Sequence, residues 1–352
     1  MKYRVLPLIL LLLISILCGG CNHEEEPVKV ILTTGFAKDE VFRIESVSCS
    51  KAEMMLLLTN TQNRYEAIFG PEIWEKDFDG VTLEENVKET VIAQISCIKT
   101  MRLLADKYQV TLSSEQENGL REAAEVYYQS LNETEIETLE VTKELIEELY
   151  VEYALADKAY RYIIKDINPE ISDDEARTIT VQQILLKTFE IDGTGQRIEY
   201  SNEIKEETYN RAQEILKLAN EEESDFEQLV LEYNESGSGT VSFGKGEMEG
   251  TLENAAFNLE TGEISGIIET SSGYHIIKCI STFDREQTDV NKIKIVEKRR
   301  EEVFGQEYEA FAQTLNKKLN DSLWEQISLC QDEEIVTSDF FDVYQEYYEK
   351  LQ

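Results

Sequence analysis

The stretch from residue 172 to residue 281 most constrains the fold, because short strand patterns and short helix patterns alternate along it. Runs of β-branched and aliphatic residues predict strands, and apolar residues three and four apart predict helices. Strands are predicted at 178–186, 241–243, 266–269 and 274–281, and helices at 203–218, 224–233 and 252–258. This β-α-α-β-α-β-β order predicts an α+β module with an antiparallel sheet and surrounding helices.

The sequence on both sides of this module is helical in pattern. Helices are predicted at 52–69, 114–131 and 290–319, and one or two more at 134–164. The segment Thr82–Glu85 has the form of a capping box, in which a threonine and a glutamate three residues later satisfy the first backbone N–H groups of a helix. The long helix that it opens places these apolar residues on one face: Val87, Val91, Ile95, Ile98, Met101 and Leu104.

These patterns divide the chain after its N-terminal segment into three parts. Pro169 ends the helical pattern before it, since proline cannot continue a helix. We therefore predict a helical domain at 22–170, an inserted α+β domain at 171–284 and a helical segment at 285–352. The last segment is expected to pack on the first, because its apolar residues, Trp324 among them, would otherwise be exposed to water.

Residues 1–21 have the pattern of an export signal. Lys2 and Arg4 precede an apolar run from Leu6 to Leu17, which is short for a membrane-spanning helix. Gly20 and Cys21 follow this run, and a polar segment begins directly after them. This end of the chain resembles a bacterial lipobox, which implies that Cys21 carries lipid. The alternative is an ordinary secretory signal with incidental cysteines.

Charge and residue counts exclude other classes of function. The 71 acidic and 34 basic residues give a formal charge of −37, which disfavours nucleic acid and anionic membrane surfaces as partners. With only two histidines, His23 and His275, the sequence shows no cluster of metal ligands. The remaining cysteines are scattered and have the pattern of buried thiols, although a bridge between Cys49 and Cys330 stays open.

The second half of the α+β module carries several short motifs in a fixed order. Gly246 and Met248 come first, and Ala256-Phe257 and Gly262-Glu263 follow before Ser272-Gly273-Tyr274-His275. This order resembles the parvulin-type (PpiC, rotamase) peptidyl-prolyl cis–trans isomerase domain. With helical segments on both sides of it, the whole chain resembles the PrsA/SurA group of extracytoplasmic foldases.

The resemblance implies a set of site residues. Gln183 replaces a histidine of the family, and Ser236 stands where the family has Cys or Asp. Together with Ser272 and His275, these residues are the predicted catalytic group. The predicted substrate-binding residues, for which plain core packing is the alternative interpretation, are Phe243, Met248, Leu252 and Phe257.

The function implied is a foldase that isomerises X–Pro bonds of unfolded secreted proteins, held by lipid on the outer face of a bacterial cell membrane. The family needs no metal or cofactor, and the Gln183 replacement implies weakened catalysis. One alternative is a non-catalytic holdase, whose helical domain binds unfolded secreted chains. Another is a surface-anchored binding protein for a wall component, although no residue specifically indicates this function.

Overall fold

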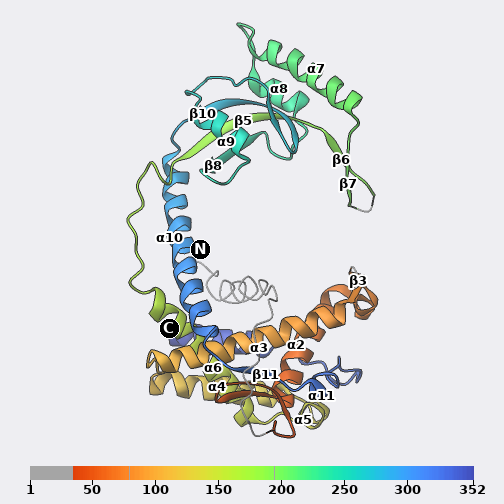
Figure 1. Ribbon diagram of the computed structural model, residues 1–352, viewed down its shortest axis with the longest axis vertical. Coiled ribbons are helices and arrows are strands. Elements are labelled where there is room, and N and C mark those ends of the chain that lie inside the picture. Colours follow the sequence, from red (N-terminus) through yellow and green to blue (C-terminus); the bar gives the residue numbers. More distant parts are fainter. Residues whose placement is uncertain (1–34, 79, 194) are drawn as a thin grey trace. The chain divides into compact units, whose positions relative to one another are not determined.

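The computed structural model describes residues 35–78, 80–193 and 195–352, so the predicted signal segment and Cys21 lie outside the described residues. The chain forms two compact units, which we describe separately. Unit 1 combines the described residues up to Asp166 with Glu301–Gln352, and unit 2 is Ile167–Arg300. Helix α10 (Arg285–Ala312) begins in unit 2 and ends in unit 1 (Figure 1).

Unit 1 consists mainly of helices around one apolar core (Figure 1). Its helices are α2 (Lys51–Phe69), α3 (Leu83–Lys107), α4 (Ser114–Ser130), α5 (Glu133–Leu139), α6 (Lys143–Ile164), α11 (Asp321–Trp324) and α12 (Phe340–Tyr348). Shorter elements are the 3₁₀ turns η1 (Pro71–Glu75) and η2 (Glu349–Leu351), and the strands β3 (Asp77–Phe78) and β4 (Val81–Thr82). The helices predicted between residues 52 and 164 are therefore confirmed.

Helix α3 shows how the sequence sets the local structure. Glu85 N donates to Thr82 Oγ1 over 3.2 Å, and Thr82 N donates to Glu85 Oε2 over 3.1 Å, so the predicted capping box is confirmed. All of the predicted apolar residues of this helix are buried. Each fully buried aliphatic side chain of this kind contributes about 1.5–3 kcal/mol to folding.

A three-stranded antiparallel sheet in unit 1 was not predicted. It has the order β11–β1–β2, with β1 at Glu40–Ile44, β2 at Val47–Ser50 and β11 at Lys317–Leu319. The helix predicted at 290–319 is wrong after Ala312, because the chain turns there and pairs with β1. Asn316 N donates to Glu45 Oε1 over 2.7 Å, a contact between residues 271 positions apart.

The C-terminal segment completes the core of unit 1. Phe340 is fully buried, and its ring lies 5.3 Å from that of Tyr127 and 4.8 Å from that of Tyr150. Tyr150 Oη donates to the Phe340 carbonyl over 2.8 Å, and Phe340 N donates to Asn60 Oδ1 over 3.1 Å. Aromatic packing and satisfied backbone groups thus hold this segment against α2, α4 and α6.

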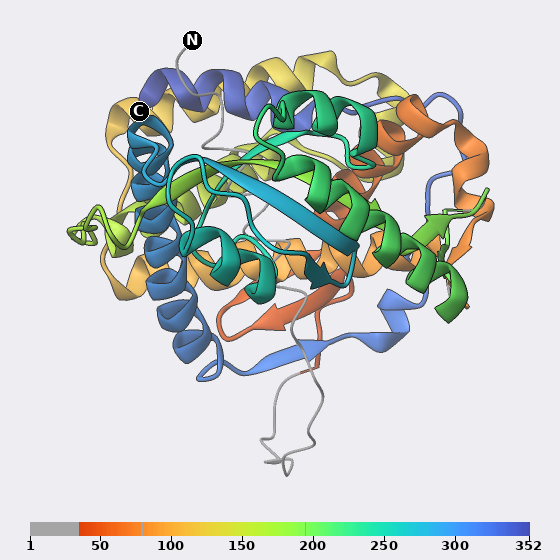
Figure 2. The same cartoon turned by 90° about the horizontal axis from the view of Figure 1, so that it is seen from above.

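Unit 2 has the predicted α+β class. Its main sheet is antiparallel in the order β8–β5–β10–β9, with α7 and α8 packed on one face and α9 on the other (Figures 1 and 2). The hairpin β6–β7 follows β5. The bounds are β5 (Thr178–Lys187), β6 (Phe189–Ile191), β7 (Arg197–Glu199), α7 (Asn202–Ala219), α8 (Phe226–Tyr233), β8 (Thr240–Gly244), α9 (Gly250–Phe257), β9 (Ile268–Thr270) and β10 (Gly273–Ser281).

The central pair of this sheet, β5 and β10, begins at a close backbone approach. Gly273 has φ of 136°, and a Cβ atom added there would lie 2.1 Å from the Leu186 carbonyl oxygen. Only glycine fits this position, since other residues are strained at such φ and would also collide with β5. The Ser272-Gly273-Tyr274-His275 motif therefore requires glycine at position 273 for steric reasons.

The described cysteines form no disulfide. Cys49, Cys97 and Cys279 are buried thiols, and Cys330 is half-buried, so the bridge between Cys49 and Cys330 is not formed. No helix among the described residues has the length and apolar character to cross a membrane.

A buried ion network lies in the core of unit 1. Lys99 Nζ is 3.1 Å from Glu53 Oε2 and 2.7 Å from Glu152 Oε2, and all three side chains are almost completely buried. Burial raises the pKa of the Glu53 carboxyl to about 7, while the Lys99 ammonium opposes that shift. Burial likewise raises the pKa of Glu152. One ammonium thus serves two carboxyl groups in a medium of low dielectric constant.

We expect Lys99→Met to lower the free energy of unfolding by about 3–5 kcal/mol at pH 8, because two carboxylates lose their buried cation. The loss should shrink as the pH falls toward 5. A carboxyl group whose pKa is raised by folding stabilises the protein below its unfolded pKa, and this contribution is lost as the pH rises through the folded value. Urea unfolding of the full chain at several pH values measures both effects.

The matched control is Lys107→Met, which removes an exposed ion pair with Glu307. It should cost no more than about 1 kcal/mol. A loss in the Lys99 variant no larger than in this control would contradict the prediction.

Candidate functional site

One face of the unit 2 sheet gathers predicted site residues from three strands. Leu185 of β5 lies opposite His275 of β10, Gln183 opposite Ile277, and Ile179 opposite Phe243 of β8. Residues directly opposite one another in an antiparallel pair share a face of the sheet, and alternate residues of a strand do so too. Gln183, His275 and Phe243 therefore lie on the face that α9 covers.

The four predicted substrate-binding residues belong to one apolar cluster. Phe243 and Leu252 are buried in it, while Met248 and Phe257 are half-buried. The rings of Phe243 and Phe257 meet edge to face with centroids 6.1 Å apart. Phe243 and Leu252 thus form the buried base of the cluster, which we call its floor. Met248 and Phe257 keep exposed surface that another molecule can contact.

Gln183 and Ser236, two residues of the predicted catalytic group, lie together. Gln183 Nε2 donates to the Ser238 carbonyl over 3.2 Å and lies 3.4 Å from Ser236 Oγ. Ser236 Oγ is in turn 2.9 Å from both Asn234 Oδ1 and the Ser238 carbonyl. These groups can donate and accept hydrogen bonds, but no base stands beside the hydroxyl to make it a nucleophile.

His275 is buried on the same face and forms no hydrogen bond with Gln183 or Ser236 among the described residues. Its Nε2 is 2.9 Å from Thr270 Oγ1, and its Nδ1 is buried without a partner among the described residues. Burial lowers the pKa of the imidazole below its usual value, and the carboxylate of Glu249 opposes that shift. His275 is therefore largely neutral at pH 7, and its unpartnered Nδ1 is not exposed to solvent.

Thr270 and the turn after it were missed by the sequence reasoning. Thr270 Oγ1 accepts from Ser272 N over 3.1 Å and contacts His275, so it links the turn to the imidazole. The resemblance implied a catalytic hydroxyl at Ser272, but Ser272 makes its contact with Thr270 through the backbone N–H. No local signal marks Thr270, because only the pairing of β9 with β10 brings it to His275.

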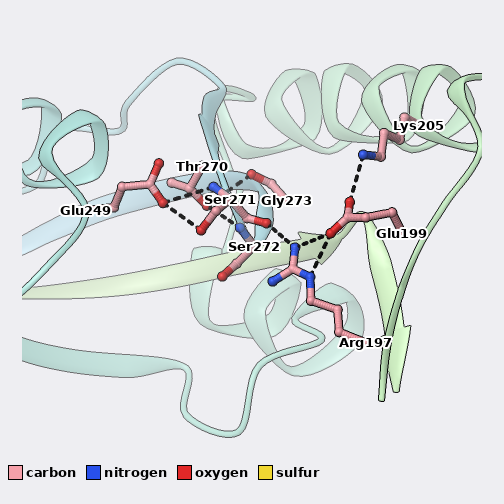
Figure 3. Close-up of polar contacts among 8 residues, drawn as sticks. All are labelled: Arg197, Glu199, Lys205, Glu249, Thr270, Ser271, Ser272 and Gly273. Atoms are coloured by element: carbon pink, nitrogen blue, oxygen red, sulfur yellow. Dashed lines mark hydrogen bonds and ion pairs between the residues drawn. The ribbon is translucent and has the colours of Figure 1, made fainter. Parts of the chain in front are cut away.

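Side chains hold this turn from two sides (Figure 3). Glu249 Oε2 accepts from both the N–H and the hydroxyl of Ser271, each over 2.9 Å. On the other side Arg197 donates to the Ser271 carbonyl. The Arg197 guanidinium also pairs with Glu199, which pairs with Lys205 at 2.8 Å. The β6–β7 hairpin and the start of α9 thus fix the turn that carries Thr270.

Comparison with known protein families identifies this unit. Residues 184–281 match the family model for Rotamase, described as the PPIC-type PPIASE domain. The chain contains a rotamase domain. The domain belongs to the peptidyl-prolyl cis–trans isomerases, and the match begins one residue after Gln183 and includes the other predicted site residues.

Relatives of two kinds resemble the chain. Foldase protein PrsA of Caldanaerobacter subterraneus subsp. tengcongensis is 24% identical over 286 residues, which cover 79% of this chain and 82% of that protein. The peptidyl-prolyl cis-trans isomerase pin1 of Schizosaccharomyces pombe is 61% identical over 36 residues, or 10% of this chain and 21% of that protein. The first likeness extends far beyond the rotamase domain, and the second is confined to a short segment.

Among solved structures, the peptidylprolyl isomerase PrsA from Bacillus cereus covers 86% of this chain and 96% of its own. It is 18% identical, with a TM-score of 0.35.

We expect His275 to titrate below the usual histidine value, and Glu249→Gln to lower its pKa further. The variant keeps an oxygen for the Ser271 bonds but removes the negative charge that favours the protonated ring. NMR titration of the ring protons measures this, and the chain has only one other histidine to assign.

Glu253→Gln is the control, since Glu253 lies on the same helix and its carboxylate bonds to Gly246 N. An unchanged His275 pKa in the Glu249 variant, or an equal change in both variants, would contradict the prediction.

Proposed function

We propose that this protein is an extracytoplasmic foldase whose rotamase domain isomerises X–Pro bonds in unfolded secreted proteins. The observation that carries the proposal is the shared sheet face, on which an apolar cluster, a polar pair and a buried neutral His275 lie together. The family likeness supplies the class of reaction, and this geometry supplies a reason why the class suits the site.

The reaction needs shape and polarity rather than covalent chemistry. Rotation about an X–Pro bond has a barrier of about 20 kcal/mol, because the twisted state loses amide resonance. That state is less polar than the planar amide, so an apolar surface favours it. We assign ring contact to Met248 and Phe257, above the floor of Phe243 and Leu252. Gln183 and Ser236 then bond polar atoms beside the rotating bond, and the buried His275 positions Thr270 and the turn after it.

The full chain should accelerate cis–trans exchange of a short proline peptide, as measured by NMR exchange spectroscopy. His275→Ala should lower kcat/KM about tenfold, equivalent to about 1.4 kcal/mol of transition-state stabilisation. Thermal unfolding of the variant checks that its fold is kept. An uncatalysed rate at high protein concentration would overturn the isomerase, and suppression of client aggregation by that inactive protein would favour the holdase.

We further propose that Gln183 makes catalysis slower than a histidine would. Gln183 bonds to Ser238 and Ser236, and no hydrogen bond joins it to His275 among the described residues. Gln183→His should therefore raise kcat/KM. Gln182→His is a matched control, because this neighbouring glutamine lies on the opposite face of β5. A rate that falls in the Gln183 variant, or rises equally in both, would contradict this assignment.

We also propose that lipid on Cys21 holds the protein on the outer face of the cell membrane. The proposal is supported by the sequence pattern of residues 1–21 alone. Each buried CH₂ group of an acyl chain contributes about 0.8 kcal/mol to membrane binding. Cys21→Ser should move the exported protein from the membrane fraction to the soluble fraction. Retention of this variant in the membrane fraction would contradict the lipid anchor.

A further inference from the structure

A groove in unit 1 has no role in the site described above. It has a volume of about 600 Å³ and opens between the end of α2, η1 and the start of α3 on one side and residues 329–336 on the other. Backbone and side chain hold the second wall in place. Gln62 Oε1 accepts from Cys330 N over 2.9 Å, and Asn63 Nδ2 donates to the Thr337 carbonyl over 2.8 Å. The groove is thus a built feature of the fold.

The charge of this groove is of one sign. Four carboxylates line it, from Glu66, Glu84, Asp332 and Glu333, and no lysine or arginine does. None of the four forms an ion pair among the described residues, although ion pairs are common elsewhere on this surface. Carboxylates gathered around a hollow reinforce one another's field, so the groove attracts positive charge.

A single metal ion does not suit this arrangement. Within the described part of the chain, no group of carboxylate, histidine and cysteine side chains is placed to hold one. Glu66 Oε1 is occupied by Trp74 Nε1 at 2.7 Å, and Glu84 Oε1 accepts from Leu329 N over 3.2 Å. The carboxylates are spread along the walls and partly engaged, which fits several separate cations.

An apolar patch continues from the groove along α2. The Trp74 ring at the groove lies 5.8 Å from the ring of Tyr65, which lies 6.1 Å from that of Phe69. Phe69 is 60% exposed and Ile68 is 74% exposed. Exposed apolar side chains gathered beside a hollow mark an interaction surface.

We propose that this acidic groove and the apolar patch beside it bind a basic, extended segment of a client protein. Lysine and arginine side chains of the segment meet the groove carboxylates, and its apolar side chains lie on Tyr65, Ile68 and Phe69. The identity of the occupant as a client chain rests on the proposed foldase function. The acidity of the groove selects among clients, because an acidic segment would be repelled at the same place.

Cys330 provides a direct test of occupancy, since it lines the groove and is half-buried, whereas the other described cysteines are buried. We expect a synthetic peptide of alternating lysine and leucine to slow alkylation of Cys330 in the full chain, followed by peptide mass spectrometry. The same peptide with glutamate in place of lysine should not. Equal rates with and without the basic peptide, or equal slowing by both peptides, would overturn the proposal.

Charge reversal tests the same surface without chemical modification. Glu333 is exposed and has no bonded partner in the part of the chain that the structure describes, so Glu333→Lys should keep the fold and weaken binding of the lysine–leucine peptide about three- to tenfold at low salt. Glu222→Lys, in an exposed loop of unit 2, is the matched control and should bind as the parent does. The double variant Ile68→Ser, Phe69→Ser tests the apolar patch and should weaken binding of the lysine–leucine peptide at high salt as well.

These experiments separate the groove from the isomerase. Glu333→Lys should leave the proline-peptide rate unchanged, because the short peptide needs only the rotamase site. Unchanged binding of the lysine–leucine peptide in both groove variants would contradict the proposed role of the groove, and it would leave the proposed isomerase activity unaffected. A chain without isomerase activity that still binds the basic peptide at the groove would sink the proposed catalysis and support the groove.

Discussion

The pairing of β5 with β10 is the constraint on which the functional unit depends. It places Gln183 and His275 on one face of the sheet, and it lets β8 and β9 add the apolar floor and Thr270 at the two edges. Gly273 makes this pairing sterically possible at its first position. A substitution there would disturb Gln183 and His275 directly, because these two residues lie on the paired strands.

In the proposed reaction, two environments of the site serve different parts of one bond. The apolar cluster around Phe243 suits a proline ring, and the polar groups of Gln183 and Ser236 suit the atoms of the rotating amide. The burial of His275 favours its neutral state, so the proposed reaction relies on fixed hydrogen-bonding groups. Such a site needs exact positions, which explains why the turn at Ser271 is held from two sides.

In unit 1, the C-terminal segment of the chain must pack against segments that are far from it in the sequence. Phe340 packs among the aromatic rings of α4 and α6, and β11 pairs with β1. The long-range contacts of this unit also build the groove, whose two walls lie more than 240 positions apart in the sequence. A catalytic unit for one bond and a charged surface for a longer segment would together suit a protein that handles unfolded chains.

The sequence by itself determined the helices between residues 52 and 164, the order of the elements of unit 2 apart from the hairpin β6–β7, and the residues of the apolar cluster. Periodicity, capping residues and short motifs are local signals, and they specify local structure. Tertiary structure alone decided the sheet of unit 1, the bond from Thr270 to His275, and the backbone role of Ser272. The sheet of unit 1 forms through strand pairing between separate segments, and no pattern within one segment encodes which other segment will lie beside it. The contacts of Thr270 lie within one hairpin, but they depend on the turn and the register that bring β9 against β10.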